Sequence, residues 1–169
     1  LYKIGRFRTE KSEKPAPTFG SGKSELQIMV PSGALAPAVE AARRGEVFAA
    51  ATLQVFDLMN APANRKTPSM VADWVKAAGE QAGFDVKVLE KEDIIEEGLD
   101  ALFAVSKGSP NAPALVLLEY GSKEQNTGAP LIGLVGKGVT FDSGGISLKP
   151  SANMHLMKSD MGGAAAVMG

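Results

Sequence analysis

The chain has 169 residues, of which 44% are hydrophobic, and its 18 basic side chains are balanced by 19 acidic ones. This size and balance fit one ordinary globular core, and they give no sign of a nucleic-acid partner or a membrane partner. Because the sequence contains no cysteine and a single histidine, disulfides and thiolate metal sites are excluded, and any metal must be held mainly by oxygen or nitrogen ligands.

The apolar runs and the two ends of the chain bear on its cellular location and on whether it is a fragment. No apolar run reaches the ~18 residues that a membrane helix needs, and the polar start is no signal peptide, so we expect a cytoplasmic protein. The chain begins without methionine and stops at Gly169, where a helix has only just begun. We therefore expect a fragment of a longer protein.

The first segment, residues 1–24, is rich in lysine, arginine, proline and glycine, which predicts a solvated linker. A basic patch for nucleic acid is the alternative, but Glu10 and Glu13 interrupt the basic residues and no aromatic residues are interleaved with them. The apolar residues 25–30 predict a short strand. The ordered part of the chain is therefore expected to begin near residue 25.

Two helices are predicted next. An alanine-rich run over residues 35–59 predicts a long helix, buried or half-buried. Its apolar side chains recur at the spacing of one helical face: Val47, Ala51, Val55 and Leu58. After a turn, Thr67 predicts an N-cap with Pro68 at the first helical position, and Gly83 predicts the end of this second helix.

Strands and short helices alternate in the middle of the chain. Residues 84–89 alternate apolar and charged side chains, which predicts a strand with one buried face. The charged run 90–98 predicts a short surface helix, with a carboxylate metal site as the alternative. Residues 114–120 and 131–135 are nearly unbroken apolar runs, typical of strands covered on both faces. The alternation predicts an α/β fold with a layered, mostly parallel sheet flanked by helices.

The chemistry concentrates after the last predicted strand. Lys137 directly follows residues 131–135, at the edge where open α/β sheets place their ligands. Asp142 and Asp160 supply carboxylates, which hard divalent cations prefer, and a lysine can join them as a neutral amine when its pKa is lowered. Lys149, still protonated, would then stabilise negative charge on a substrate oxygen. These residue types predict a metal-assisted site.

Other interpretations of the same segment are open. A lone histidine between apolar residues, His155, is more often structural than a ligand. Met157 could line an apolar substrate pocket, although the residues alone favour core packing. The run GLVGKG is not followed by a helix, as a dinucleotide loop would be, and Lys137 is followed by glycine rather than Ser or Thr, which argues against a P-loop.

One segment strongly resembles the metal-binding region of the leucyl aminopeptidases, the cytosolic M17 metallopeptidase family: VGKGVTFDSGGISLKPSANMHLMKSDMGGAAAV. The runs NAPANRKTP and AVSKGS resemble earlier landmarks of that family, so the resemblance covers the chain from about Ala49 onward. Residue by residue, the resemblance implies metal ligands at Lys137, Asp142 and Asp160. Asp142 would be the carboxylate shared by two metals.

The resemblance also implies an activity. Lys149 matches the catalytic lysine that polarises the scissile carbonyl and stabilises the gem-diolate, and Met157 matches a residue of the pocket for the substrate's first side chain. Two divalent cations, usually zinc or manganese, and a metal-bridging water that attacks the first peptide bond are implied. A homohexamer acting on peptide substrates is expected, with bicarbonate bound in the complete enzyme.

The chain departs from the family in two ways. The separate N-terminal domain is missing, so residues 1–24 are expected to be the linker from it and residues 25–169 the first part of the metallopeptidase catalytic domain. The family's NTDAEGR-type segment, with further carboxylate ligands and an arginine for bicarbonate, lies beyond Gly169. We therefore expect this fragment alone to bind metal weakly and to be inactive.

The leading hypothesis is a dinuclear-metal aminopeptidase that releases leucine-like N-terminal residues from peptides. The alternative from another class is a non-catalytic scaffold or assembly module of the same fold. A nucleotide-binding α/β enzyme is a second alternative, and it predicts binding of ATP or NAD without added divalent metal.

Overall fold

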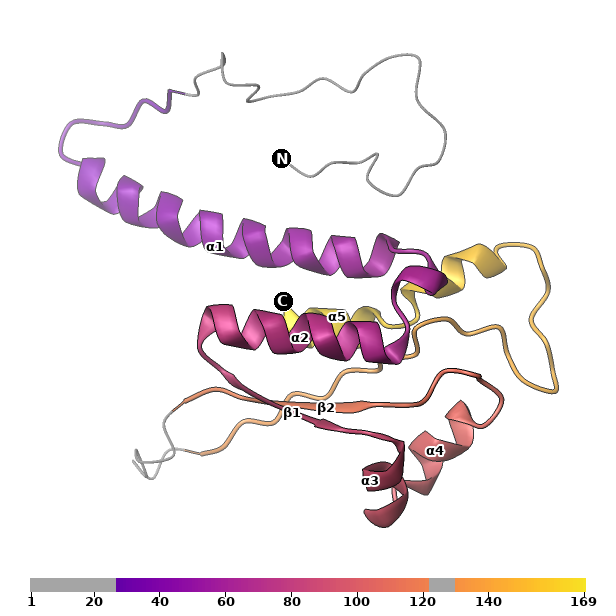
Figure 1. Ribbon diagram of the computed structural model, residues 1–169. Coiled ribbons are helices and arrows are strands. Elements are labelled where there is room, and N and C mark those ends of the chain that lie inside the picture. The colour runs from indigo at the N-terminus through magenta and orange to yellow at the C-terminus, as the bar shows by residue number, and fades with distance from the viewer. Residues whose placement is uncertain (1–26, 122–129) are drawn as a thin grey trace.

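A computed structural model describes residues 27–121 and 130–169 (Figure 1). The linker predicted over residues 1–24 lies outside these two ranges. In chain order the helices (α), 3-10 helices (η) and strands (β) are α1 (Leu35–Asn60), η1 (Ala63–Arg65), α2 (Pro68–Ala82), β1 (Asp85–Leu89), α3 (Lys91–Glu96), α4 (Asp100–Ser106), β2 (Leu115–Glu119), η2 (Met154–Ser159) and α5 (Gly162–Met168). None of the helices in these ranges combines the length and the apolar character needed to cross a bilayer.

The predicted first helix is confirmed as α1, but its apolar face is covered at one end only. Leu58 is buried and Val55 packs against the core, whereas Val47, two to three turns earlier, is 69% exposed. The difference arises because η2 and α5 pack against α1 near its C-terminus. The C-terminal half of α1 is therefore the part that packs against the hydrophobic core.

The end signals predicted for the second helix are confirmed in α2. The Thr67 hydroxyl oxygen accepts a hydrogen bond from the Met70 amide at 3.4 Å, and Pro68 occupies the first helical position. Gly83 ends the helix in the left-handed region, with φ of +78°, where a side chain would be strained. Local side-chain chemistry thus sets both ends of α2.

The core joins three helices. Leu58 of α1, Met161 and Ala165 are buried together. Partly buried side chains from α1, α2 and α5 surround them: Val55, Met59, Val71, Trp74 and Met168. Because Met161 is almost fully enclosed, the backbone next to it is fixed by apolar packing.

The sheet confirms the α/β class, but the direction of its strands differs from the prediction. β1 and β2 pair antiparallel, from Asp85 opposite Glu119 to Leu89 opposite Leu115. In Figure 1, α2 lies between α1 and this pair of strands. The pair is antiparallel because α3 and α4 reverse the chain between the strands, and apolar patterns carry no information on strand direction. Parallel pairing is not found among the described strands.

The strand predicted over residues 131–135 is wrong. This segment belongs to no strand, and the side chains of Leu131 and Val135 are 98% and 99% exposed. An apolar run becomes a strand only beside a hydrogen-bonded neighbour, and neither β1 nor β2 pairs with it. Residues 27–30, the described part of the strand predicted at 25–30, also form no strand.

The charged run 90–98 contains α3, as predicted. Ile94 is buried, while the acidic side chains around it are exposed. The Asp93 carboxylate accepts a hydrogen bond from the Glu90 amide at 2.9 Å and so caps the start of the helix. The charges of this run are explained by solvation and capping, and the surface-helix interpretation is confirmed.

A buried lysine lies where α1 ends. Lys66 is 1% exposed, and its ammonium group donates hydrogen bonds to the carbonyl oxygens of Leu58 at 2.9 Å, Met59 at 3.3 Å and Lys158. Burial, and then the positive charge of Lys158, lower the pKa of Lys66 to about 8. The folded protein therefore holds this proton less tightly than the unfolded chain does.

This lowered pKa predicts a rise in stability at alkaline pH. Between pH 8 and pH 10.5 the folded state loses the Lys66 proton before the unfolded state does, so the free energy of unfolding should increase by about 3 kcal/mol across that window. Urea denaturation of the full-length protein and its Lys66→Met variant, at pH 7 and pH 10.5, measures this contribution as a difference. A stability difference between the two proteins that does not change with pH contradicts the prediction.

Candidate active site

Lys137 and Asp160 meet although they lie far apart in the sequence. The Lys137 ammonium nitrogen is 2.8 Å from Oδ2 of Asp160, and the nearby carboxylate raises the pKa of Lys137. The backbone brings them together, because the Ala164 amide at the start of α5 donates to the Lys137 carbonyl oxygen at 2.9 Å. The position of Lys137 therefore depends on how closely its segment approaches α5.

That approach requires a glycine before Lys137. A Cβ atom on Gly136 would lie 2.5 Å from the Gly163 carbonyl oxygen and 2.6 Å from the Ala164 Cα. We expect Gly136→Ala to lower the free energy of unfolding by about 1–3 kcal/mol, because backbone atoms cannot move aside cheaply. Urea denaturation of the full-length protein tests this.

The matched control is Gly133→Ala. A Cβ atom there would meet nothing within 4 Å, so the change should shift stability by no more than about 1 kcal/mol in either direction. Equal effects of the two substitutions would show that the contact with α5 does not matter.

Asp142 and Lys149 form the second ion pair, across a tight loop. Oδ1 of Asp142 accepts the Gly144 amide at 2.9 Å, and Oδ2 lies 2.9 Å from the Lys149 ammonium nitrogen. The Lys149 amide closes the loop by donating to the Ser143 carbonyl oxygen at 3.0 Å. The Lys149 hydrogen bond, followed by that of the Gly144 amide, lowers the pKa of Asp142. Asp142 is therefore held as a carboxylate at neutral pH.

The two ion pairs belong to one cluster. Lys137 and Asp142 each shift the pKa of the other through their charges. Lys149 also contacts η2, since its ammonium nitrogen lies 3.5 Å from the sulfur of Met157. All five residues that the sequence predicts for the site are thus brought together. His155, which the sequence pattern favours as a structural residue over a metal ligand, is exposed on η2.

The donor set fits part of a divalent metal site. Two carboxylates and a lysine converge, and Oδ2 of Asp160 is enclosed without a well-aligned hydrogen bond, although Lys137 lies close to it. Such an oxygen is well suited to a cation. Asp160 raises the pKa of Lys137 instead of lowering it, so Lys137 would ligate only where a bound cation displaces its proton. Across the described ranges, no three His, Asp or Glu side chains gather closely enough to hold a metal ion. The residues present therefore supply some of the ligands that a pair of dications needs.

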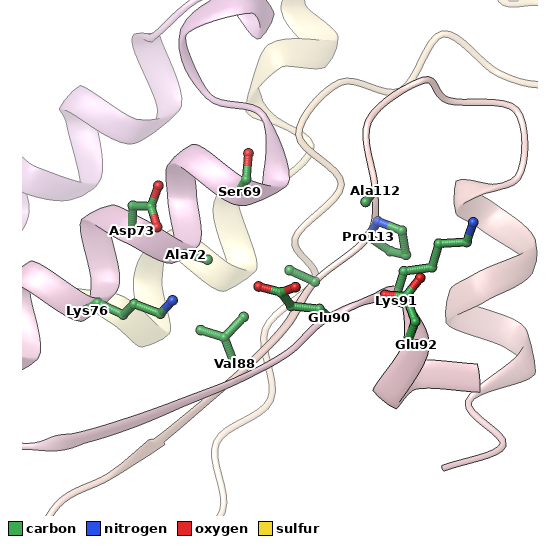
Figure 2. A pocket seen from close by; sticks show the side chains of 11 residues that line it. Ser69, Ala72, Asp73, Lys76, Val88, Glu90, Lys91, Glu92, Ala112 and Pro113 are labelled. Carbon is green, nitrogen blue, oxygen red and sulfur yellow. The ribbon is translucent and has the colours of Figure 1, made fainter. Parts of the chain in front are cut away.

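A separate hollow of about 220 Å³ lies between α2, the end of β1 and the segment before β2 (Figure 2). Ser69, Asp73 and Lys76 line it from α2, and Glu90 and Lys91 line it near the start of α3. Its charged side chains are exposed, and it contains none of the five predicted site residues. The hollow is therefore separate from the lysine and aspartate cluster.

Lys66 is the residue near the site that sequence reasoning missed. It lies between two predicted helices, and the signal that could have found it is a cation just after a helix C-terminus, where carbonyl groups lack partners. Its burial depends on η2, because its ammonium group binds the carbonyl oxygen of Lys158, which lies 92 residues later in the sequence. No local pattern predicts such a distant contact.

Comparisons with known proteins identify the family of the chain. Residues 54–169 match the family model described as the cytosol aminopeptidase family, catalytic domain. The chain is 40% identical to a probable cytosol aminopeptidase of Alkaliphilus oremlandii, over 99% of this chain and 32% of that protein. The chain belongs to the cytosol aminopeptidase family. It spans about a third of the length of that relative.

Solved structures of cytosol aminopeptidase relatives share the fold. The apo leucyl aminopeptidase of Trypanosoma cruzi is 38% identical, with a TM-score of 0.66 over 72% of this chain and 23% of that one. The bottromycin maturation enzyme BotP in complex with Mn is 46% identical, with a TM-score of 0.62 over 71% of this chain and 25% of that one. Another BotP structure covers 99% of this chain and 31% of that one, at 38% identity and a TM-score of 0.75. These likenesses confirm the α/β class.

Proposed function

We propose that this chain is the first part of the catalytic domain of a dinuclear-metal aminopeptidase, which releases leucine-like residues from the N-termini of peptides. Membership of the cytosol aminopeptidase family gives the reaction class. The observation that carries the proposal is the meeting of Lys137, Asp142, Lys149 and Asp160 in two linked ion pairs. The cluster is also fixed by the backbone, because the Ala164 amide binds the Lys137 carbonyl oxygen and the Lys149 amide binds the Ser143 carbonyl oxygen.

Each residue has a proposed role. Lys137, Asp142 and Asp160 would hold the divalent ions, with Asp142 shared between them. When bound, two such ions lower the pKa of a water molecule and clamp the oxygens of the tetrahedral intermediate. The Mn complex of BotP supports manganese, with zinc as the other candidate. Asp142 suits its role because its pKa is lowered, so it presents a charged carboxylate.

Lys149 would act on the substrate. Its ammonium group would donate a hydrogen bond to the scissile carbonyl oxygen and stabilise the negative charge that develops there. It lies between Asp142 and Met157, so a carbonyl next to it would also be next to the proposed ligands. Met157, half-buried on η2, would line the pocket for the first side chain of the peptide. An unbranched thioether accommodates several apolar side chains.

Several properties of the whole protein are also proposed. They are a homohexamer, a cytoplasmic location, bicarbonate in the complete site, and little or no activity for this chain alone. The last of these follows from the ligand count, since two carboxylates and one amine fall short of what a pair of dications needs.

The test is hydrolysis of leucine p-nitroanilide by the full-length protein supplied with Mn²⁺. We expect cleavage that a chelator abolishes and that added Mn²⁺ restores. N-acetylated leucine p-nitroanilide, which lacks the free α-amine, should not be cleaved. A folded, metal-loaded protein that leaves the free-amine substrate intact would instead support the non-catalytic scaffold.

A further inference from the structure

The carbonyl groups at the end of α1 need partners from outside the helix. The last carbonyls of a helix have no intrahelical donors, and the Leu58 carbonyl lacks one in particular because Pro62, four residues later, has no amide hydrogen. The Lys66 ammonium group supplies donors to the carbonyls of Leu58 and Met59. A cation at this position also suits the negative end of the helix dipole.

The same ammonium group binds the segment that leads into the active site. It donates to the carbonyl of Lys158 in η2, between Met157, which faces Lys149, and Asp160, which faces Lys137. A second contact runs in the opposite direction, because the Lys158 side chain donates to the Asn60 carbonyl at 3.3 Å. The end of α1 and η2 are thus joined by two lysines.

Burying the Lys66 ammonium group costs free energy of folding. The Lys66 side chain is almost fully buried, and the positive charge of Lys158 acts on it as well. Removing a cation from water beside another cation is unfavourable unless its hydrogen bonds are well made. A methionine of similar volume would fill the space without the free-energy cost of burying a charge. What lysine provides and methionine cannot is the set of hydrogen bonds donated to the backbone carbonyls.

We propose that Lys66 is a positioning residue of the metal site: by binding the Lys158 carbonyl it sets where Met157 and Asp160 lie relative to Lys149 and Lys137. The inference rests on the proposed function. Lys66 touches neither of the ion pairs, and it acts through the backbone of η2. Its loss should therefore alter metal binding as well as fold stability.

The test compares four variants of the full-length protein. Lys66→Met removes all donors, Lys66→Gln keeps a neutral donor, and Lys66→Arg keeps charge and donors. Lys76→Met is the matched control, since Lys76 is exposed on α2 at the hollow of Figure 2. Calorimetric titration with Mn²⁺ gives the Kd without substrate, at a temperature where thermal melting shows each variant to be folded. Turnover of leucine p-nitroanilide gives kcat and KM.

Lys66→Met should raise the Kd for Mn²⁺ about 10- to 100-fold, the range found when groups that orient metal ligands are removed. Lys66→Gln should fall between Lys66→Met and wild type, Lys66→Arg should recover most of the affinity, and Lys76→Met should match wild type. A folded Lys66→Met that binds Mn²⁺ within twofold of wild type overturns the proposal, because a purely structural role predicts a lower melting temperature alone. If Lys66→Met does not fold, Lys66→Gln within twofold of wild type overturns it.

The two proposals fail in different ways. Wild type that binds Mn²⁺ and cleaves the peptide analogue, with Mn²⁺ affinity unchanged by Lys66→Met, or by Lys66→Gln where Lys66→Met does not fold, overturns only the positioning role. Wild type that binds Mn²⁺ without cleaving overturns the peptidase assignment, and the Kd values of the variants still decide the role of Lys66. Wild type that binds no Mn²⁺ overturns both.

Discussion

Lys149→Met in the full-length protein should lower kcat for leucine p-nitroanilide about 10²- to 10³-fold, which corresponds to roughly 3–4 kcal/mol of lost transition-state stabilisation. The physical reason is that the ammonium group stabilises charge that appears only as the tetrahedral intermediate forms. Steady-state kinetics with Mn²⁺ present at saturation measures the loss.

Metal content separates this loss from a failure to bind metal. The Lys149 ammonium nitrogen lies 2.9 Å from Oδ2 of Asp142, so removing its positive charge should leave cation binding at least as strong as before. Lys107→Met is the control, because Lys107 lies over the ring of Phe103 beyond the end of α4. Metal-loaded Lys149→Met with kcat within a few-fold of wild type would remove Lys149 from the mechanism.

Asp142→Asn should weaken Mn²⁺ binding by more than about 100-fold. Changes to groups that merely orient a ligand cost 10- to 100-fold, and here a charged ligand shared by two ions would itself become neutral. Asparagine keeps the shape and can still accept the Gly144 amide at the position of Oδ1, so the loop should survive. Calorimetric titration with Mn²⁺ measures the change in both Kd and stoichiometry.

Asp73→Asn is the matched control for this substitution. Asp73 is exposed on α2, in the hollow of Figure 2 and outside the site, so neutralising it should leave Mn²⁺ binding unchanged. Retention of full Mn²⁺ affinity and stoichiometry by Asp142→Asn would show that the metals are held elsewhere.

The features predicted correctly from the sequence are those that neighbouring residues decide. The ends of α2 follow from Thr67, Pro68 and Gly83, whose hydroxyl, ring and missing Cβ act within one helical turn. The alternation of apolar and charged side chains over β1 also predicted correctly that one face of the strand is more buried than the other. The structure also brings together the five residues that the sequence proposes for the site, and their roles stay predictions.

The features predicted wrongly or missed depend on distant partners. An apolar run such as residues 131–135 is a strand only when another strand lies beside it, and the direction of β2 depends on how α3 and α4 reverse the chain. Lys66 was missed because the carbonyl that buries it comes from η2. Composition and spacing describe only a residue's neighbours in the sequence. These three cases depend on neighbours in space.

The exposed apolar segment at 131–135 has a practical consequence for protein production. It pairs with neither β1 nor β2, and its largest side chains face solvent. Such an exposed apolar segment is a surface on which a second copy can associate. A recombinant polypeptide limited to these 169 residues should therefore form soluble aggregates whose size grows with concentration, which light scattering would detect, and charged substitutions at Leu131 and Val135 should reduce them.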